Sequence, residues 1–210
     1  MKKIGLIGYG ELGRQFEHLL SGLSDDISFV YFDDQAKKNG AKNSHPFNNF
    51  LNDEFKDIEF LIGLGYKHLK KKKEIIDILI EKKRKLLTFI HPTAIIDSTA
   101  KIEEGTFIYP NVTIDKNVRI GKGCLLNLSV TVSHDSVIGE CCYLSPSVTL
   151  SGFVVIGGMV FLGTGVNVAN NIKINSSAIV GIGSVITKNI EPSQIVIGNP
   201  QRVIRKIKLI

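Results

Sequence analysis

Two adjacent residues, His134 and Asp135, offer the clearest chemistry in the chain. A neutral imidazole can take a proton from a reacting group, and a neighbouring carboxylate can hold the ring in the tautomer that leaves its acceptor nitrogen free. His134 is also the only histidine that follows residue 91. The alternative interpretation is a plain solvent-exposed histidine in a turn.

A second group of chemically informative residues lies near the start of the chain. Residues 2–7 are typical of a buried strand, and a helical stretch to about residue 23 follows a glycine turn. The turn has the pattern GxGxxG, with Gly8, Gly10 and Gly13. Such a turn brings backbone N–H groups and a helix N-terminus up to a phosphate. A purely structural glycine turn is the alternative.

The next two predicted strands also end in residues that suit a nucleotide. Residues 27–32 lead into Asp33 and Asp34, where an acidic group commonly meets a ribose or a base edge. Residues 59–64 lead into Gly65 and Tyr66. Only about ninety residues are available here, enough for one βαβαβ half rather than two. We therefore expect a nucleoside diphosphate moiety rather than NAD.

The remainder of the chain has a six-residue period. From Ile90 to Glu191 it divides into seventeen units whose first position is always Ile, Leu or Val, and whose fifth position is small or β-branched. Eight fourth positions are Gly or Asn, which tolerate positive φ at a corner. Each unit is therefore predicted to be a short strand and a turn, and three units to close a triangular coil of eighteen residues.

This period positions the chemistry. His134 is the third residue of its unit, which faces outward, so it is not a core histidine. Gly152 lies eighteen residues further on and is expected one coil above. Cys124 and Cys142 are also eighteen apart and are predicted to stack as reduced core residues.

The chain resembles the sialic acid O-acetyltransferase-like sugar acetyltransferases, particularly bacterial enzymes that N-acetylate nucleotide-linked amino sugars. The resemblance rests on GYGELGRQ near the start, YFDD at 31–34, IHPTA at 90–94, the segment 127–139 and GNPQRVIR at 198–205. It implies an α/β, Rossmann-like half domain over residues 1–89 that binds the nucleotide sugar. Residues 90–210 would form a left-handed parallel β-helix with a C-terminal segment on the CoA side. The handedness follows from the resemblance alone.

The resemblance also implies roles for residues. His134 would be the general base, Asp135 its orienting carboxylate, and the Gly152 amide a donor to the oxyanion that forms when a sugar amine attacks acetyl-CoA. Asn127 matches a position that contacts the sugar, although an Asn in a turn can equally be structural.

For acetyl-CoA, the resemblance implies a groove between the β-helices of a homotrimer. Candidate residues for this groove are Tyr143, Gly152, Gly163, Gly181, Pro200, Arg202 and Arg205. Exposed basic residues at a chain end often only face solvent. Two departures from the family pattern bear on ligand binding: Leu12 stands where relatives often have a His near the phosphates, and Tyr143 replaces a second His near the thioester.

Composition limits the remaining possibilities. The net charge is +6, but much of the excess lies in residues 67–85, a predicted helix with a solvated face. We expect no nucleic-acid partner, no metal, no membrane insertion and a cytoplasmic location. Alternatives are O-acetylation of a sialic acid, a sugar-nucleotide sensor without catalysis, and a metal-dependent hydratase, which would need three His ligands.

Overall fold

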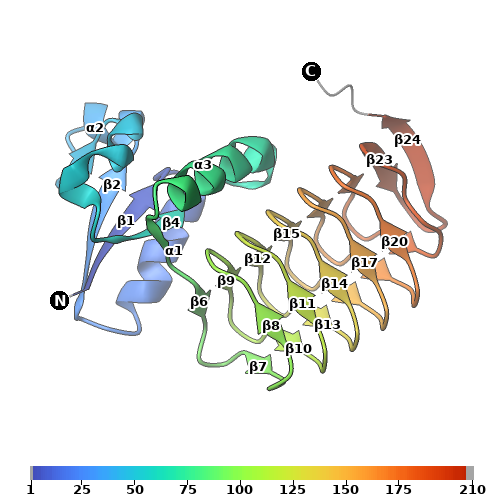
Figure 1. Ribbon diagram of the computed structural model, residues 1–210. Coiled ribbons are helices and arrows are strands. Elements are labelled where there is room, and N and C mark those ends of the chain that lie inside the picture. Colours follow the sequence, from blue (N-terminus) through green and yellow to red (C-terminus); the bar gives the residue numbers. More distant parts are fainter. Residues whose placement is uncertain (1, 207–210) are drawn as a thin grey trace. The chain divides into compact units, whose positions relative to one another are not determined.

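The computed structural model describes residues 2–206, and the chain divides into two compact units between Thr88 and Phe89. The first unit is an α/β structure, and the second is a stack of short strands (Figure 1). Each unit has its own buried apolar core.

The first unit is built on a five-stranded parallel sheet with the order β3-β2-β1-β4-β5. Its strands are β1 (Lys2–Ile7), β2 (Ile27–Phe32), β3 (Ser44–His45), β4 (Glu59–Ile62) and β5 (Lys85–Leu86). The strand order reverses between β1 and β4, which creates a switch point where ligands of open α/β sheets commonly bind. The strands predicted over residues 2–7 and 27–32 are confirmed, and the one predicted over residues 59–64 ends earlier, at Ile62. The strands β3 and β5 have only two residues each, too few for a sequence pattern to predict them.

Helices connect these strands. They are α1 (Glu11–Ser21), α2 (Asp34–Lys38) and α3 (Leu69–Glu81), with 3₁₀ turns at Phe47–Leu51, Asp53–Phe55 and Tyr66–His68. Helix α3 was expected to carry its basic residues on a solvated face. Lys72 departs from this, because it is only 3% exposed.

The second unit is a parallel β-helix whose two-residue strands form three sheets. One sheet contains β7 (Ile95–Ile96), β10 (Thr113–Ile114), β13 (Thr131–Val132), β16 (Thr149–Leu150), β19 (Asn167–Val168) and β22 (Val185–Ile186). The next contains β8 (Lys101–Ile102), β11 (Arg119–Ile120), β14 (Val137–Ile138), β17 (Val155–Ile156) and β20 (Lys173–Ile174). The third contains β6 (Phe89–Ile90), β9 (Phe107–Ile108), β12 (Leu125–Leu126), β15 (Tyr143–Leu144), β18 (Phe161–Leu162) and β21 (Ile179–Val180).

The register confirms the predicted coil of eighteen residues. Thr131 pairs with Thr149, and Val137 pairs with Val155. First positions are buried from Ile108 to Ile186, but Ile90 is 42% exposed, because a first coil has a neighbouring coil on one side only. Cys124 and Cys142 are free and buried as predicted, and burial raises the pKa of the Cys142 thiol well above its usual value.

The corners depend on a left-handed backbone conformation. Every fourth position from Gly105 to Gly183 has positive φ, including Asp135 and Phe153, which are not the residues usually found there. After the last coil, β23 (Gln194–Ile197) continues the third sheet, and β24 (Arg202–Lys206) pairs with it in antiparallel fashion.

Candidate active site

His134 and Asp135 occupy the corner between β13 and β14. The distance from His134 Nδ1 to Asp135 Oδ2 is 3.0 Å. Neighbouring residues can make this contact because Asp135 adopts φ 58°, and Asp tolerates the left-handed region better than most residues. An ionised carboxylate only accepts hydrogen bonds, so Nδ1 carries the proton and Nε2 is left as the acceptor nitrogen.

Asp135 is held from its other side as well. Asn117 Nδ2 donates to Asp135 Oδ1 over 3.0 Å. The hydrogen bond from Asn117, then that from His134, and the nearby charge of Lys116 hold the pKa of Asp135 below its usual value. The carboxylate therefore stays ionised throughout the neutral range, as an orienting partner must.

The His134 ring lies directly against Gly152. A Cβ atom at position 152 would be 2.6 Å from His134 Cε1 and 2.8 Å from Nε2, which is closer than real side chains come. Phe153 packs edge-on against the ring, with the centroids 5.2 Å apart. Gly152 therefore makes room for the imidazole, a role beyond the one inferred from the sequence.

The Gly152 amide, predicted to stabilise an oxyanion, has a partner in this structure. Its N–H donates to Asn170 Oδ1 over 3.1 Å. Asn170 stands eighteen residues after Gly152, and Asn117 stands eighteen before Asp135. Sequence reasoning missed both asparagines, although the eighteen-residue spacing that identified Gly152 would have found them.

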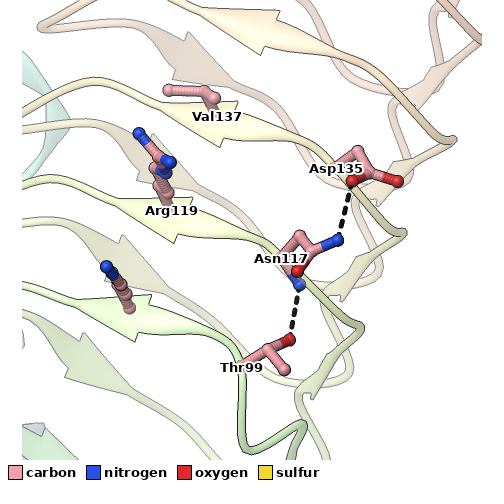
Figure 2. Close-up of a pocket in the computed structure, with 6 residues that line it drawn as sticks. Thr99, Asn117, Arg119, Asp135 and Val137 are labelled. Atoms are coloured by element: carbon pink, nitrogen blue, oxygen red, sulfur yellow. Dashed lines mark hydrogen bonds between the residues drawn. The ribbon is translucent and has the colours of Figure 1, made fainter.

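A pocket of about 500 Å³ lies beside Asp135, on the face of the sheet that contains β8, β11 and β14. Figure 2 shows Asp135, Asn117 and Thr99 one above another along its edge, with Arg119 and Val137 on neighbouring strands. Lys101 completes the lining, and its strand neighbour is Arg119. Two cations and an ionised carboxylate therefore line this pocket.

Other predicted ligand residues lie on a different part of the β-helix. Tyr143 is on β15, and Asn127, Gly163 and Gly181 directly follow strands of that same third sheet. Asn127 is 8% exposed, and its Oδ1 accepts the N–H of Leu128 over 2.7 Å. The sheet containing β13 separates this corner from His134. One copy of the chain therefore does not bring these residues to the imidazole.

The remaining cofactor candidates belong to the C-terminal segment. Pro200 lies in the turn between β23 and β24, and Arg202 and Arg205 are exposed on β24. Their contact with CoA phosphates stays a prediction.

The glycine turn of the first unit follows β1 at the switch point. Gly8 has φ 85°, and a Cβ at Gly13 would be 2.4 Å from the Gly8 carbonyl oxygen. Gly10 and Gly65, in contrast, have nothing within 4 Å of their Cβ positions. Gly10 precedes α1 and provides no side-chain cap, so the first N–H groups of this helix are not capped by a side chain.

The two acidic residues after β2 have structural partners. Asp33 Oδ2 accepts the N–H of Tyr9 over 2.9 Å, and its Oδ1 caps α2 by accepting the N–H of Ala36 over 2.8 Å. Asp34 Oδ1 accepts the N–H of Phe47 over 2.9 Å. Their predicted contact with a ribose is untested. The structure adds a second role for Asp33, which ties the glycine turn to the end of β2.

Side chains next to the turn complete this end of the sheet. Tyr66 is 45% exposed beside the open Gly65. Arg14, two residues after the atypical Leu12, pairs with Glu11 at 2.8 Å and lies 5.8 Å from the centre of the Tyr9 ring.

Over residues 2–206, no three metal-ligating side chains come together in a group that could hold an ion. No helix within this range combines the length and apolar character that a membrane span requires.

Comparisons with known proteins place this architecture. The stacked parallel sheets match the left-handed parallel β-helix of solved acetyltransferase structures. Residues 90–196, just over half of the chain, match the family model described as GMPPB C-terminal domain, and the chain belongs to this family. No curated protein matches the chain.

Several solved structures are similar over nearly the whole chain, among them the following three. A perosamine N-acetyltransferase from Caulobacter crescentus, solved as a mutant with CoA and GDP-perosamine, is 20% identical with a TM-score of 0.88, covering 98% of each chain. The acetyltransferase domain of PglB from Neisseria gonorrhoeae, solved with acetyl coenzyme A, is 26% identical with a TM-score of 0.83, covering 97% of this chain and 99% of that one. WeeI from Acinetobacter baumannii is 23% identical with a TM-score of 0.87, covering 97% of this chain and all of the other.

Proposed function

We propose that the protein is an acetyl-CoA-dependent N-acetyltransferase that acts on the amino group of a nucleotide-linked amino-dideoxy sugar, at the sugar C4 amine, in surface glycan biosynthesis. The observation that carries the proposal is the outward imidazole of His134, held at Nδ1 by Asp135 and seated on Gly152. Two solved proteins with the same fold support the reaction class: one is named as an N-acetyltransferase with CoA and GDP-perosamine bound, and the other as an acetyltransferase domain with acetyl coenzyme A bound.

The chemistry follows from this geometry. The amine nitrogen attacks the thioester carbonyl, and His134 Nε2 accepts the proton that the nitrogen must lose. When the tetrahedral intermediate collapses, the C–S bond breaks and the proton passes to the CoA sulfur, so that an amide and CoA leave. The Gly152 N–H can donate a hydrogen bond to the oxyanion of the tetrahedral intermediate. To do so, it must give up its hydrogen bond to Asn170 Oδ1.

The first unit is proposed as a Rossmann-like site for the nucleotide. Its strand order reverses between β1 and β4, and the open positions Gly10 and Gly65 follow those two strands. A phosphate can approach the backbone closely where no Cβ intervenes, and uncapped N–H groups at the start of α1 are suitable donors. Tyr66 offers an exposed ring beside this opening.

A homotrimer is proposed because the candidate residues lie along two different corners of the triangular β-helix. His134 and Gly152 are on one corner, whereas Asn127, Gly163 and Gly181 are on another. The two sets can serve one acetyl group only where two copies pack side by side. Three copies arranged in a ring provide three equivalent sites. Sedimentation of the purified protein as a monomer would contradict this arrangement.

The experiment that tests the function is an acetyl-transfer assay on UDP-, dTDP-, GDP- and CMP-linked amino sugars, with release of the CoA thiol as the signal. At least one sugar should be acetylated, and His134→Ala should lower kcat by at least about a hundredfold while the affinity for the nucleotide sugar is kept. Free sialic acid serves as the competing acceptor. Preferential O-acetylation of it, tight sugar-nucleotide binding without transfer, or near-normal turnover by His134→Ala would overturn the proposal.

A further inference from the structure

We propose that Asn117 is a positioning residue for the reaction, because it fixes the carboxylate that orients the catalytic imidazole. This inference rests on the proposed function. Asn117 stands one coil below Asp135 at the same corner, and its amide nitrogen lies 3.0 Å from Asp135 Oδ1 (Figure 2).

Asn117 is itself fixed from below. Its backbone N–H donates to Thr99 Oγ1 over 2.7 Å, and the Thr99 hydroxyl donates to Asp97 Oδ1 over 2.6 Å. The direction of both bonds is fixed, because a backbone N–H can only donate and the Thr99 hydroxyl proton is committed to Asp97. A chain of hydrogen bonds thus runs up the corner from Asp97 to His134.

The orientation of the Asn117 amide is determined by what it faces. An ionised carboxylate only accepts hydrogen bonds, so the NH₂ end must point at Asp135 and the carbonyl end away from it. The low pKa of Asp135 keeps the carboxylate in the form that this arrangement requires.

The hydrogen bond from Asn117 determines which oxygen of Asp135 faces His134. A carboxylate on an exposed corner can rotate, since the torsion that turns it is broad. The bond from Asn117 takes Oδ1 and leaves Oδ2 for His134 Nδ1, so both oxygens have assigned partners. Without the amide, the carboxylate can turn, and the imidazole loses the restraint that keeps Nε2 as the acceptor.

The chain contains a matched control for this role. Asn111 is also the fourth residue of a unit, with φ 59° like Asn117, and its N–H donates to a threonine, Thr93 Oγ1, over 3.1 Å. The residue one coil above Asn111 is Ser129 instead of an aspartate. Glycine is the right replacement at both positions, because it removes the side chain without the cost that alanine meets at positive φ.

The experiment compares Asn117→Gly with Asn111→Gly. For Asn117→Gly, kcat/KM for the amino sugar should fall by between about tenfold and a hundredfold, and the acid limb of the kcat/KM–pH profile should move to lower pH. The shift follows because an Asp135 carboxylate that has turned away from Nδ1 stabilises the protonated imidazole less. Asn111→Gly should leave both quantities unchanged, and the two variants should melt at similar temperatures.

A readout that does not depend on catalysis accompanies the assay. In the ¹⁵N-labelled protein, the imidazole nitrogens of His134 should report a protonated Nδ1 in the wild type and a mixture of tautomers in Asn117→Gly. An active wild type with unaltered turnover, pH profile and His134 resonances in Asn117→Gly would overturn the positioning role and leave the proposed function intact. A wild type that acetylates no amino sugar would instead overturn the proposed function, and the His134 resonances would still test the contact.

Discussion

Gly63 in the first unit and Gly152 in the second serve different purposes. Gly63 lets backbone approach backbone: a Cβ at this position would be 2.3 Å from the Gly8 carbonyl oxygen and 2.9 Å from Gly13 Cα. In the second unit, Gly152 lets a side chain approach backbone, because the space a Cβ would fill is taken by the His134 ring. The close contact at Gly63 stabilises a turn, whereas the space at Gly152 accommodates the imidazole of His134.

Because of this difference, we expect a substitution at Gly63 to affect stability and one at Gly152 to affect activity. A backbone carbonyl at the switch point cannot move without disturbing β1 and β4, whereas the His134 ring can swing away from an added methyl group with little effect on the coil. The same substitution, glycine to alanine, should therefore have different effects at Gly63 and at Gly152.

The largest expected effect is on activity. Gly152→Ala should displace the His134 ring and lower kcat by about a hundredfold. A displacement of roughly 1 Å in an active site can reduce the rate by this factor. Its control is Gly158→Ala, also at the third position of a unit, where the nearest atom to the added Cβ is the Glu140 carbonyl oxygen at 3.4 Å. Steady-state assays and melting curves of both variants test this. A Gly152→Ala protein that unfolds more readily but turns over normally would break the comparison.

The six-residue period made much of this site predictable. It placed His134 outward, aligned Gly152 with it and buried Cys124, because each position in a coil has one environment that repeats. Residue types alone were less informative about which corners have positive φ. Gly and Asn indicated this conformation at several corners, but Asp135 and Phe153 adopt it as well.

What could not be predicted depends on side-chain contacts. The bond from Asn117 to Asp135 needs a turn geometry that a period does not specify. The partners of Asp33 are backbone N–H groups from two separate segments, so the pattern of an acidic residue after a strand did not reveal its capping role. Counting strands by threes assigns Tyr143 to the third sheet and His134 to the corner between β13 and β14. The proposed contact between copies of the chain has no such period and could not be counted.

A smaller effect is expected on the stability of the first unit. Gly63→Ala should destabilise it by about 1–3 kcal/mol, because the methyl group meets a backbone carbonyl that has little freedom to move. Gly65→Ala, where nothing lies within 4 Å, should change stability by less than about 0.5 kcal/mol.

Hydrogen exchange at the amides of β1 and β4 measures this unit separately from the β-helix. Faster exchange is expected in Gly63→Ala alone. Equal protection in the two variants would show that the turn can relax, and the distinction between the two kinds of glycine would fail.

The smallest effect concerns acid stability at the Asp135 corner. Hydrogen bonds from Asn117 and His134 lower the pKa of Asp135 from its usual 3.8. A carboxyl whose pKa is lower in the folded protein adds stability above the unfolded value, and that stability is lost as the pH falls through the folded value. The melting temperature of the wild type should therefore exceed that of Asp135→Asn by a small, constant amount at neutral pH, and the difference should shrink below pH 3.8. Because the Asp135 side chain is still 31% exposed, solvent keeps the effect small. A difference that instead grew toward acid pH would mean that the corner prefers the neutral side chain, and Asp135 would then be a poor partner for a protonated Nδ1.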